Sequence, residues 1–578
     1  MAGFMKLFSY KEPKNQEMGF ELLENENEGT QQEKVGKDPS TSNTHQKKWA
    51  PLLAKWTDKT KKEKSAPSRE DQMSSDITKN LETIRKNFLM PKNKDINIRE
   101  LRIGRKYKAF VVYIEGMVDK KTLNLSIFPQ LMEKNVFDEL GKENPLDFLM
   151  QNVLTVHMVR RTNLYSDAIL QVLSGMSALF VEDCKECILI DTKGFAMRSV
   201  QPPITETVIL GSQEAFTENL RTNVSMVRRI IKNKNLVSEF MAIGSTSHSQ
   251  CTIMYLEGVA NPKVIEEVKK RLNKISTDLV LGNGMIEQFI EDNSFMLFPQ
   301  ILSTERPDRT ASFIIEGQVV IIADGTPFAL TVPVTFFRLL HTSEDMLARW
   351  PFGAFLRFVR LFGLFCATLL PGLYVAAVLF HIEMMPTMFV ESIVQAKESV
   401  PFPTVVEILI MEGAFELIRE GGVRVPSVIG QTLGIVGALI LGQAAVGAGL
   451  VSPMMVIIVS ITALGNFAIP NYSLALAIRI ERFLFIIVGS LLGFYGIALI
   501  MCLLAYLACS MKSFGVPFFS PIAPRTKVNP DVVLRTPIWM QKNRADYMNT
   551  GDRKKQGPNV KLWATMKTHQ SRDKGDKT

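Results

Sequence analysis

Four glutamates lie in an otherwise apolar stretch, residues 404–420, which reads TVVEILIMEGAFELIRE. They are Glu407, Glu412, Glu416 and Glu420. A carboxylate at membrane depth is costly, so acidic residues in such a stretch usually have a function. On an α-helix each residue turns by about 100°, so the last three glutamates share one stripe about 80° wide, and Glu407 lies about 140° from Glu412.

Two interpretations of this acidic stretch remain open. In the first, the protein is a homo-oligomer with the stretch near its axis and the carboxylates facing water, because rings of acidic side chains line cation pathways. In the second, the carboxylates pair with Arg419 and Arg424 at the membrane surface and act as a structural clamp. In the first interpretation the apolar faces pack on other helices, and their residues are Val405, Ile408, Leu409, Phe415 and Leu417.

The stretch is surrounded by uncharged runs that are long enough to cross a bilayer. Residues 426–478 contain no Asp, Glu, Lys, Arg or His, and they suffice for two crossings with Pro453 near the break. Residues 361–380 and 483–511 supply two more, and Arg479 to Arg482 separate the long run from the last of them. We expect four to six crossings, depending on whether residues 404–420 cross or lie at the interface. Arg357 and Arg360 precede the first run and favour a cytoplasmic start.

Small residues recur in the long uncharged run at a spacing of four. Gly434, Ala438 and Gly442 form one series, and Ala445 and Gly449 form another. Such spacing lets a neighbouring helix backbone approach closely, which is how helices associate in lipid. The sequence therefore predicts a packing face here, although a glycine-rich span that is merely tolerated has the same pattern.

The first half of the chain is polar and contains two similar units. Tyr113-Ile-Glu-Gly recurs as Tyr255-Leu-Glu-Gly, and Gly175 recurs as Gly317; the members of each pair are 142 residues apart. Two matches in one register indicate duplication. Strands alternate with helices in each unit, including a hairpin turning at Asp324-Gly325, so we expect a small α/β layer with a mixed sheet.

The predicted architecture is a duplicated α/β cytoplasmic domain followed by an α-helical transmembrane domain. No signal peptide is apparent at the N-terminus, so the N- and C-terminal regions are expected in the cytoplasm. The predicted parts are a disordered polar arm (1–75), a first α/β unit (76–210), a bridging helix (211–243), a second α/β unit (244–345), a transmembrane helical domain (346–520) and a basic cytoplasmic tail (521–578).

The chain carries a formal net charge of +9, and its basic residues are concentrated after Met511, where 14 Lys or Arg face five Asp. A basic segment beside a membrane span favours contact with anionic lipid head groups, or simple solvation. Nucleic-acid binding is not expected, because no aromatic residues are interleaved on a folded platform.

Motifs of enzymes and metal sites are missing from the sequence. It has no phosphate-binding glycine loop, no Gly-x-Ser-x-Gly and no His-Glu-x-x-His. Cys184-x-x-Cys187 lacks a second ligand pair, so incidental thiols in a hairpin are the better interpretation. Residues 304–308, TERPD, are interpreted as a loop salt bridge. We predict no enzyme and no catalytic, cofactor or metal site.

Several longer motifs carry a resemblance that covers residues 195–524. They include GSQEAFTENLRTN from Gly211, YLEGVANP from Tyr255, DGTPFALTVP from Asp324, LPGLY from Leu370, ELIREGGVRVP from Glu416 and GLVSP from Gly449. In these motifs the chain resembles the A subunit of the spore germinant receptor, in the GerA family. The resemblance implies an inner spore membrane protein that works with a transporter-like, nutrient-binding B subunit and a C-subunit lipoprotein.

The same resemblance implies a nutrient-sensing complex similar to a ligand-gated ion channel, in which this chain forms or gates a cation path that starts germination. Two alternatives stay open. One is a membrane-anchored interaction scaffold whose helices only hold the duplicated domain in place. The other is an A-like paralogue encoded with the dipicolinate channel of sporulation stage V, which shares most of these motifs.

Overall fold

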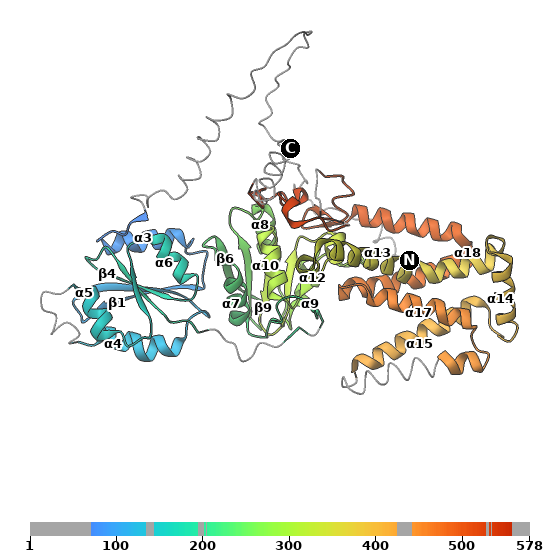
Figure 1. Cartoon of the computed structure of the whole chain (residues 1–578), viewed down its shortest axis with the longest axis horizontal. Coiled ribbons are helices and arrows are strands. Elements are labelled where there is room, and N and C mark those ends of the chain that lie inside the picture. Colours follow the sequence, from blue (N-terminus) through green and yellow to red (C-terminus); the bar gives the residue numbers. More distant parts are fainter. Residues whose placement is uncertain are drawn as a thin grey trace, which may run out of the picture.

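The computed structural model describes residues 71–134, 144–194, 202–203, 205–424, 442–526, 531–532 and 534–557. Two α/β units and a bundle of helices follow one another along the longest axis of the molecule (Figure 1). Nearly all of the predicted arm, residues 1–75, lies outside the described residues. The predicted arm and all domain boundaries therefore remain predictions.

The first α/β unit is a five-stranded sheet with helices on both faces. Its strands follow the order β1-β2-β4-β5-β3, and every neighbouring pair is antiparallel. Helices α3 and α6 cover one face, whereas η2, α4, α5 and η3 cover the other. The elements are α3 (Ile77–Asn87), β1 (Ile96–Ile103), β2 (Tyr107–Ile114), η2 (Thr122–Ile127), α4 (Phe128–Met132), α5 (Pro145–Phe148), η3 (Leu149–Val153), β3 (Val159–Thr162), α6 (Tyr165–Val172), β4 (Ser177–Val181) and β5 (Cys187–Ile190).

The second unit has the equivalent strand order, β6-β7-β9-β10-β8, again antiparallel throughout. Helices α7 and α10 pack on one face and α8 and α9 on the other. The elements are α7 (Leu220–Ile230), β6 (Leu236–Ile243), β7 (Ser249–Leu256), α8 (Pro262–Asn273), α9 (Asn283–Ile290), β8 (Leu302–Thr304), α10 (Pro307–Ile315), β9 (Val319–Ala323) and β10 (Ala329–Val332).

The predicted mixed sheet is wrong, because both sheets are purely antiparallel. Continuous apolar strands such as β9 are typical of parallel sheets, whose two faces are both covered. Here helices cover both faces of an antiparallel sheet, so β4 and β9 are buried at every residue. The predicted hairpin at Asp324-Gly325 does join β9 to β10, and Gly325 has a φ of +81°, which favours glycine.

The glycines that repeat in the sequence occupy matching turns in the two units. Gly116 and Gly258 have φ values of +86° and +83°, and Gly175 and Gly317 both have +95°. Each of the four glycines lies in a turn between two elements. At these positive φ values a residue with a Cβ atom would be strained. The sequence repeat thus coincides with equivalent backbone geometry.

A buried ion pair joins the two units. Arg228, on α7, donates to Asp95, and both side chains are almost fully buried. Its guanidinium also donates to Asn93 Oδ1 at 3.1 Å and to Ser238 Oγ at 3.2 Å. Helix α7 packs on the second sheet while its arginine reaches the first unit; the assignment of residues 211–243 as a bridging helix stays a prediction. The rest of that segment includes β6, a strand of the second sheet.

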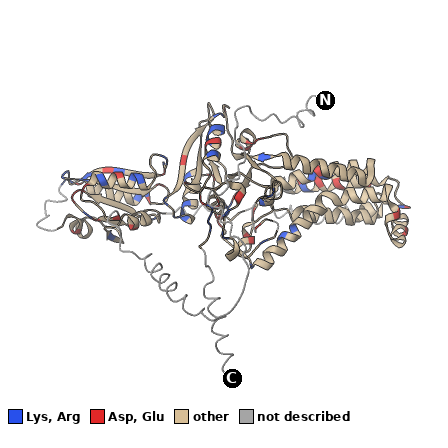
Figure 2. Ribbon diagram, turned by 90° about the horizontal axis from the view of Figure 1, so that it is seen from above, with Lys and Arg blue, Asp and Glu red and all other residues tan. Residues whose placement is uncertain are grey.

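The bundle begins where short helices lead out of the second unit. Helices α13 and α18 are the two described helices that are long and apolar enough to cross a membrane, and α17 is shorter and apolar. Figure 2 shows few acidic or basic residues along the bundle compared with the α/β units. The elements are α11 (Phe336–Leu339), α12 (Ser343–Leu347), α13 (Trp350–Phe380), η4 (Ile382–Met384), α14 (Thr387–Lys397), α15 (Thr404–Arg424), α17 (Pro453–Phe467) and α18 (Tyr472–Ser510).

Helix α18 consists of two arms that meet at Gly493, whose φ of 60° and ψ of −146° are not helical. Phe494 then stacks on His381 at the end of α13, with ring centroids 4.7 Å apart. The second arm, residues 494–510, returns beside the first, because Ala508 packs in the same cluster as Leu474. The two arms run side by side and both pack against α13.

After the bundle, the chain returns to the second unit. Beyond β11 (Lys512–Ser513) and β12 (Val516–Pro517), it includes η5 (Ile538–Met540) and η6 (Asp546–Met548). The Gly551 amide donates to the Val259 carbonyl at 3.1 Å, and Arg544 Nε donates to the Ile315 carbonyl at 2.9 Å. The charge count suggested a solvated or lipid-bound tail; the described part instead packs on the protein. Lipid contact stays a prediction for residues 558–578, which lie outside the described residues.

A network of charges fixes the junction between the second unit, α13 and the tail. Asp345, fully buried on α12, accepts from Arg357 at 3.1 Å and from Arg360 at 2.7 Å. Arg357 also pairs with Asp531 of the tail, at 2.5 Å. His341 Nε2 donates to the Val532 carbonyl oxygen at 2.8 Å, and burial, together with Arg357 and Arg338, holds the pKa of His341 well below its usual range.

We expect replacement of Arg228 by alanine to destabilise the pair of units strongly. The change leaves the Asp95 carboxylate buried without its partner, which typically costs about 3–5 kcal/mol. Urea denaturation of residues 71–345, followed by circular dichroism, measures this loss. Each unit has its own internal core, so we expect this fragment to fold alone with mixed helix and strand signals.

Arg85→Ala serves as the matched control, because Arg85 pairs with Glu100 on the surface, where the two side chains are 52% and 63% exposed. Exposed pairs contribute less than about 1 kcal/mol. Equal losses in the two variants would contradict the assignment of Arg228 as the buried link.

Candidate functional site

The acidic helix α15 lies on one side of the bundle, with the carboxylates of Glu407 and Glu412 directed inward. Glu407 and Glu412 are both completely buried. The outward positions are aliphatic: Ile410 is 44% exposed and Leu417 is 75% exposed. The predicted orientation, with carboxylates toward water and aliphatic faces against other helices, is therefore wrong for the single chain. A helix surrounded by apolar helices keeps its charges where other elements supply partners.

Glu407 joins three elements near the start of α15. One carboxylate oxygen, Oε2, accepts from the Ser452 backbone amide at 3.0 Å. Lys397 Nζ, in the last turn of α14, lies 3.7 Å from the other oxygen. Ser452 is the N-cap of α17, so the carboxylate also lies at a helix N-terminus, where a negative charge is favourable.

Glu412 and Glu416 form a compact network with two arginines of α18. Arg482 NH2 lies 3.2 Å from Glu412 Oε2 and 2.9 Å from Glu416 Oε1. Arg479 NH1 donates to Glu416 Oε2 at 3.0 Å. Arg482 is as buried as Glu412, whereas the Glu416 side chain is 26% exposed. Two carboxylates and two guanidiniums thus balance in charge and connect α15 to the first arm of α18.

The predicted clamp partners, Arg419 and Arg424, are described only in part. The Arg419 guanidinium lies over the Phe467 ring, 5.7 Å from its centroid, and the ion pairs of Glu407, Glu412 and Glu416 in the described residues are with other cations. Arg424 is the last residue of α15, and its side chain lies outside the described part of the chain. Glu420 is exposed. Glu407, Glu412 and Glu416 pair with Lys397, Arg479 and Arg482, and the pairing of the acidic stretch with Arg424 stays a prediction.

Sequence reasoning missed these cations because Arg479 and Arg482 were assigned to a break between two membrane runs. The structure places both within the first arm of α18. One feature of the sequence does indicate these partners. Arg479 and Arg482 are three residues apart and so share a helix face, and a buried carboxylate requires a cation at the same depth.

The predicted small-residue face is only partly described. Gly434 and Ala438 lie outside the described residues. A Cβ on Gly442 would meet only Val456 Cγ1, at an ordinary 3.8 Å, whereas one on Gly449 would meet Ser399 O at 2.8 Å. Ala445 lies against the cluster around Met455.

Closer helix contacts occur at glycines outside the predicted series. A Cβ on Gly465, in α17, would lie 2.5 Å from the Gly363 carbonyl oxygen of α13. On the other side of α13, a Cβ on Gly372 would lie 2.8 Å from the Phe485 carbonyl oxygen. Here the backbones of α13, α17 and α18 approach so closely that only glycine fits.

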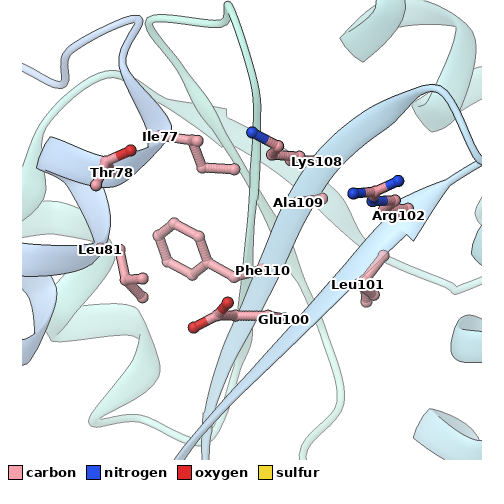
Figure 3. A pocket seen from close by; sticks show the side chains of 9 residues that line it. All are labelled: Ile77, Thr78, Leu81, Glu100, Leu101, Arg102, Lys108, Ala109 and Phe110. Carbon is pink, nitrogen blue, oxygen red and sulfur yellow. The ribbon is translucent and has the colours of Figure 1, made fainter.

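A surface hollow of 480 Å³ lies between α3 and the β1-β2 hairpin. Figure 3 shows Leu81 and Phe110 on its apolar side, with Arg102 and Lys108 on the other. Glu100 pairs with Arg85, and Lys108 Nζ lies 3.8 Å from Glu182. The acidic side chain of the hollow, Glu100, and one of its two cations, Lys108, are therefore already paired within the protein. We assign the hollow no role.

The remaining sequence candidates are structural. Cys184 and Cys187 are buried free thiols, and burial raises the pKa of the Cys184 thiol to about 11. No group of three or more metal-ligating side chains occurs among the described residues. Arg306 NH2 pairs with Asp308 at 2.8 Å, which confirms the predicted salt bridge in residues 304–308.

The sequence matches the family model described as Bacillus/Clostridium GerA spore germination protein over residues 82–547. That match covers most of the chain, and the chain belongs to the GerA family. Spore germination protein KA of Bacillus subtilis (strain 168) is 39% identical over 488 residues, which are 84% of this chain and 89% of that protein.

Two further comparisons are with a second Bacillus protein and with a solved structure. YfkQ of the same strain, described as an uncharacterized membrane protein, is 39% identical over 486 residues, which are 84% of this chain and 93% of that protein. The crystal structure of the N-terminal domain of the A subunit of the Bacillus megaterium spore germinant receptor GerK3 is 34% identical. It covers 46% of this chain and 97% of its own, with a TM-score of 0.37.

We expect Arg482→Met to destabilise the bundle more than Arg482→Met combined with Glu412→Gln. The single change leaves a buried carboxylate unpaired, at a cost of about 3–5 kcal/mol, and the second change removes that charge. Thermal unfolding of the full chain in detergent measures both. A double variant as unstable as the sum of the single variants would contradict the pairing.

We also expect Gly465→Ala to lower the melting temperature of the full chain, because the added methyl group would collide with the α13 backbone. Gly442→Ala is the matched change at a site with room, and it should be neutral or stabilising by up to about 1 kcal/mol through helix propensity. The reverse order of stability would restore the predicted packing face and contradict the contact between α13 and α17.

Proposed function

We propose that this chain is the membrane-embedded A subunit of a nutrient-sensing germinant receptor and forms or gates a cation path that initiates germination. Membership of the GerA family supports the role in germination. One relative is described as a spore germination protein and another as a membrane protein, and both descriptions support the proposal. By this proposal the chain works with a transporter-like B subunit and a C-subunit lipoprotein, and several copies assemble around the path.

The main support for the gating role is the network of ion pairs among Glu412, Glu416, Arg479 and Arg482. Breaking a buried ion pair leaves uncompensated charge, so such a network has one strongly preferred arrangement and resists intermediate ones. A change that repacks α18 against α15 must therefore exchange one set of pairs for another. This is the behaviour required of a gate with two discrete states.

The route from the soluble part to this network runs through the first arm of α18. Leu474 and Ile478 pack in one cluster with Phe298, Val334 and Phe336 of the second unit. Arg479 and Arg482 follow directly on the same helix. A displacement of the second unit, caused by a partner subunit that has bound a nutrient, would reach the network within two helical turns.

The placement of the tail supports an even number of crossings. Helix α13 leaves the second unit, and after the second arm of α18 the tail packs on that same unit, through the contacts of Gly551 and Arg544. Both soluble parts then lie on one side of the membrane. Arg349, Arg357 and Arg360 near the start of α13 favour the cytoplasmic side for that end.

The two α/β units support a recognition role for the soluble part. We propose that they arose by duplication, because their strand orders match and their repeated glycines have the same φ values. No enzyme activity is part of the proposal.

Potassium flux tests the proposal. Glu416→Gln removes the charge that both arginines share, so the closed arrangement should be weakened by about the energy of one charged hydrogen bond, roughly a tenfold change in the open fraction. In proteoliposomes containing the assembled receptor, we expect about tenfold higher potassium efflux before any nutrient is added.

Glu383→Gln is the control, because Glu383 is exposed on η4 at the far end of the bundle. Unchanged flux in Glu416→Gln, with normal protein level and normal response to nutrient, would reduce the network to a structural clamp. Absence of any flux through the unsubstituted receptor would favour the interaction scaffold.

A further inference from the structure

A pocket of 330 Å³ lies at the junction between the bundle and the second α/β unit. Its walls come from α13, from both arms of α18, and from aromatic residues beside the bundle. They include Phe298 and Phe336 of the second unit, Leu364 of α13, and Met501 and Leu504 of the second arm. The walls are therefore almost entirely apolar.

Glu481 is the exception in this lining. Its side chain comes from the first arm of α18 and is 2% exposed, and Oε1 has no hydrogen-bond partner. Across the described residues the carboxyl group makes no hydrogen bond and no ion pair. The neighbouring arginines do not compensate it, because Arg479 and Arg482 donate to Glu416. On a helix Glu481 points about 160° from Arg479 and about 100° from Arg482.

The other polar side chain in the lining is already satisfied. The Thr368 hydroxyl donates to the Leu364 carbonyl at 2.8 Å, within its own helix. The pocket thus presents one buried carboxyl group without a donor, surrounded by hydrocarbon and aromatic rings. A buried carboxylate in this situation is unfavourable unless a cation or a donor reaches it.

We propose that this pocket binds a hydrophobic primary ammonium compound. The ammonium group would donate to the ionised Glu481 carboxylate, whose two oxygens only accept hydrogen bonds, and the apolar tail would lie along the α13 and α18 walls. The volume is at the lower end of the range for small-molecule sites. A metal ion does not fit this lining, because calcium and magnesium need several oxygen ligands and the pocket offers one carboxyl group.

The location gives such a ligand a point of action that is separate from the network of Glu412 and Glu416. Phe298 and Phe336 lie beside the bundle, whereas Glu481 lies on α18. A bound molecule would contact both and stabilise their present arrangement.

Binding of n-octylammonium to the full chain in phospholipid nanodiscs tests the proposal. We expect saturable binding by titration calorimetry after subtraction of empty nanodiscs, and affinity for n-octanol weaker by about tenfold or more, since the alcohol cannot form the charged hydrogen bond. Glu481→Gln should weaken octylammonium binding by a similar factor while leaving octanol unchanged. Glu383→Gln, an exposed acid elsewhere in the bundle, should change neither.

A second variant keeps the test decisive if Glu481→Gln does not accumulate. Ala505 lines the pocket and is exposed, so Ala505→Phe should obstruct the pocket without disturbing the core, and octylammonium binding should be lost. Equal binding of octanol and octylammonium to the unsubstituted chain would overturn the proposal. So would undiminished octylammonium binding in Glu481→Gln or in Ala505→Phe.

Discussion

A charged side chain is costly to bury among apolar helices unless a partner lies at the same depth, and this constraint determines how α15 sits in the bundle. Glu412 and Arg482 are both essentially inaccessible and lie 3.2 Å apart. If α15 were turned so that its carboxylates faced outward, Arg482 would be left buried and unpaired on α18. The pairing thus fixes the rotation of α15, and the rotation places Ile410 and Leu417 on the outer surface.

The same constraint acts at the junction with the soluble part. Asp345 is fully buried and is balanced by Arg357 and Arg360 from the first turns of α13. Asp531 of the tail shares Arg357, so the tail is held by the same charges that hold α13. The second unit, the bundle and the tail are therefore joined by shared ion pairs as well as by the apolar cluster around Phe336 and Leu474. A movement in one of them must be accommodated by the others.

Local features could be predicted from the sequence because they depend on near neighbours. The Asp324-Gly325 turn lies where its dipeptide indicates, and Gly175 and Gly317 of the sequence repeat have the same φ. The direction of neighbouring strands could not be predicted, since helices cover both faces of an antiparallel sheet and remove the alternation that would reveal it.

The candidate site could be predicted only in part. The glutamates of residues 404–420 were identifiable because a carboxylate in an apolar stretch is conspicuous. Their partners were not, since Arg479 and Arg482 lie more than sixty residues further along the chain and resemble a break between two membrane spans. The packing of the tail on the second unit could not be predicted either. Arg544 donates to a backbone carbonyl, and every residue carries such a carbonyl, so the sequence does not single out the partner.

If the Glu412 carboxylate faces the bundle, Leu417 must face outward. Site-directed spin labelling at residue 417 measures whether that position contacts lipid or water. Leu417→Cys and Leu281→Cys, at leucines that are 75% and 72% exposed, would carry the label in a chain whose native cysteines are replaced. Collisions with oxygen report lipid, and collisions with a nickel chelate report water. In lipid bilayers the account predicts that the label at 417 is reached by oxygen and protected from nickel, whereas the label at 281 on the soluble unit is reached by nickel. Strong nickel access at 417 would contradict it.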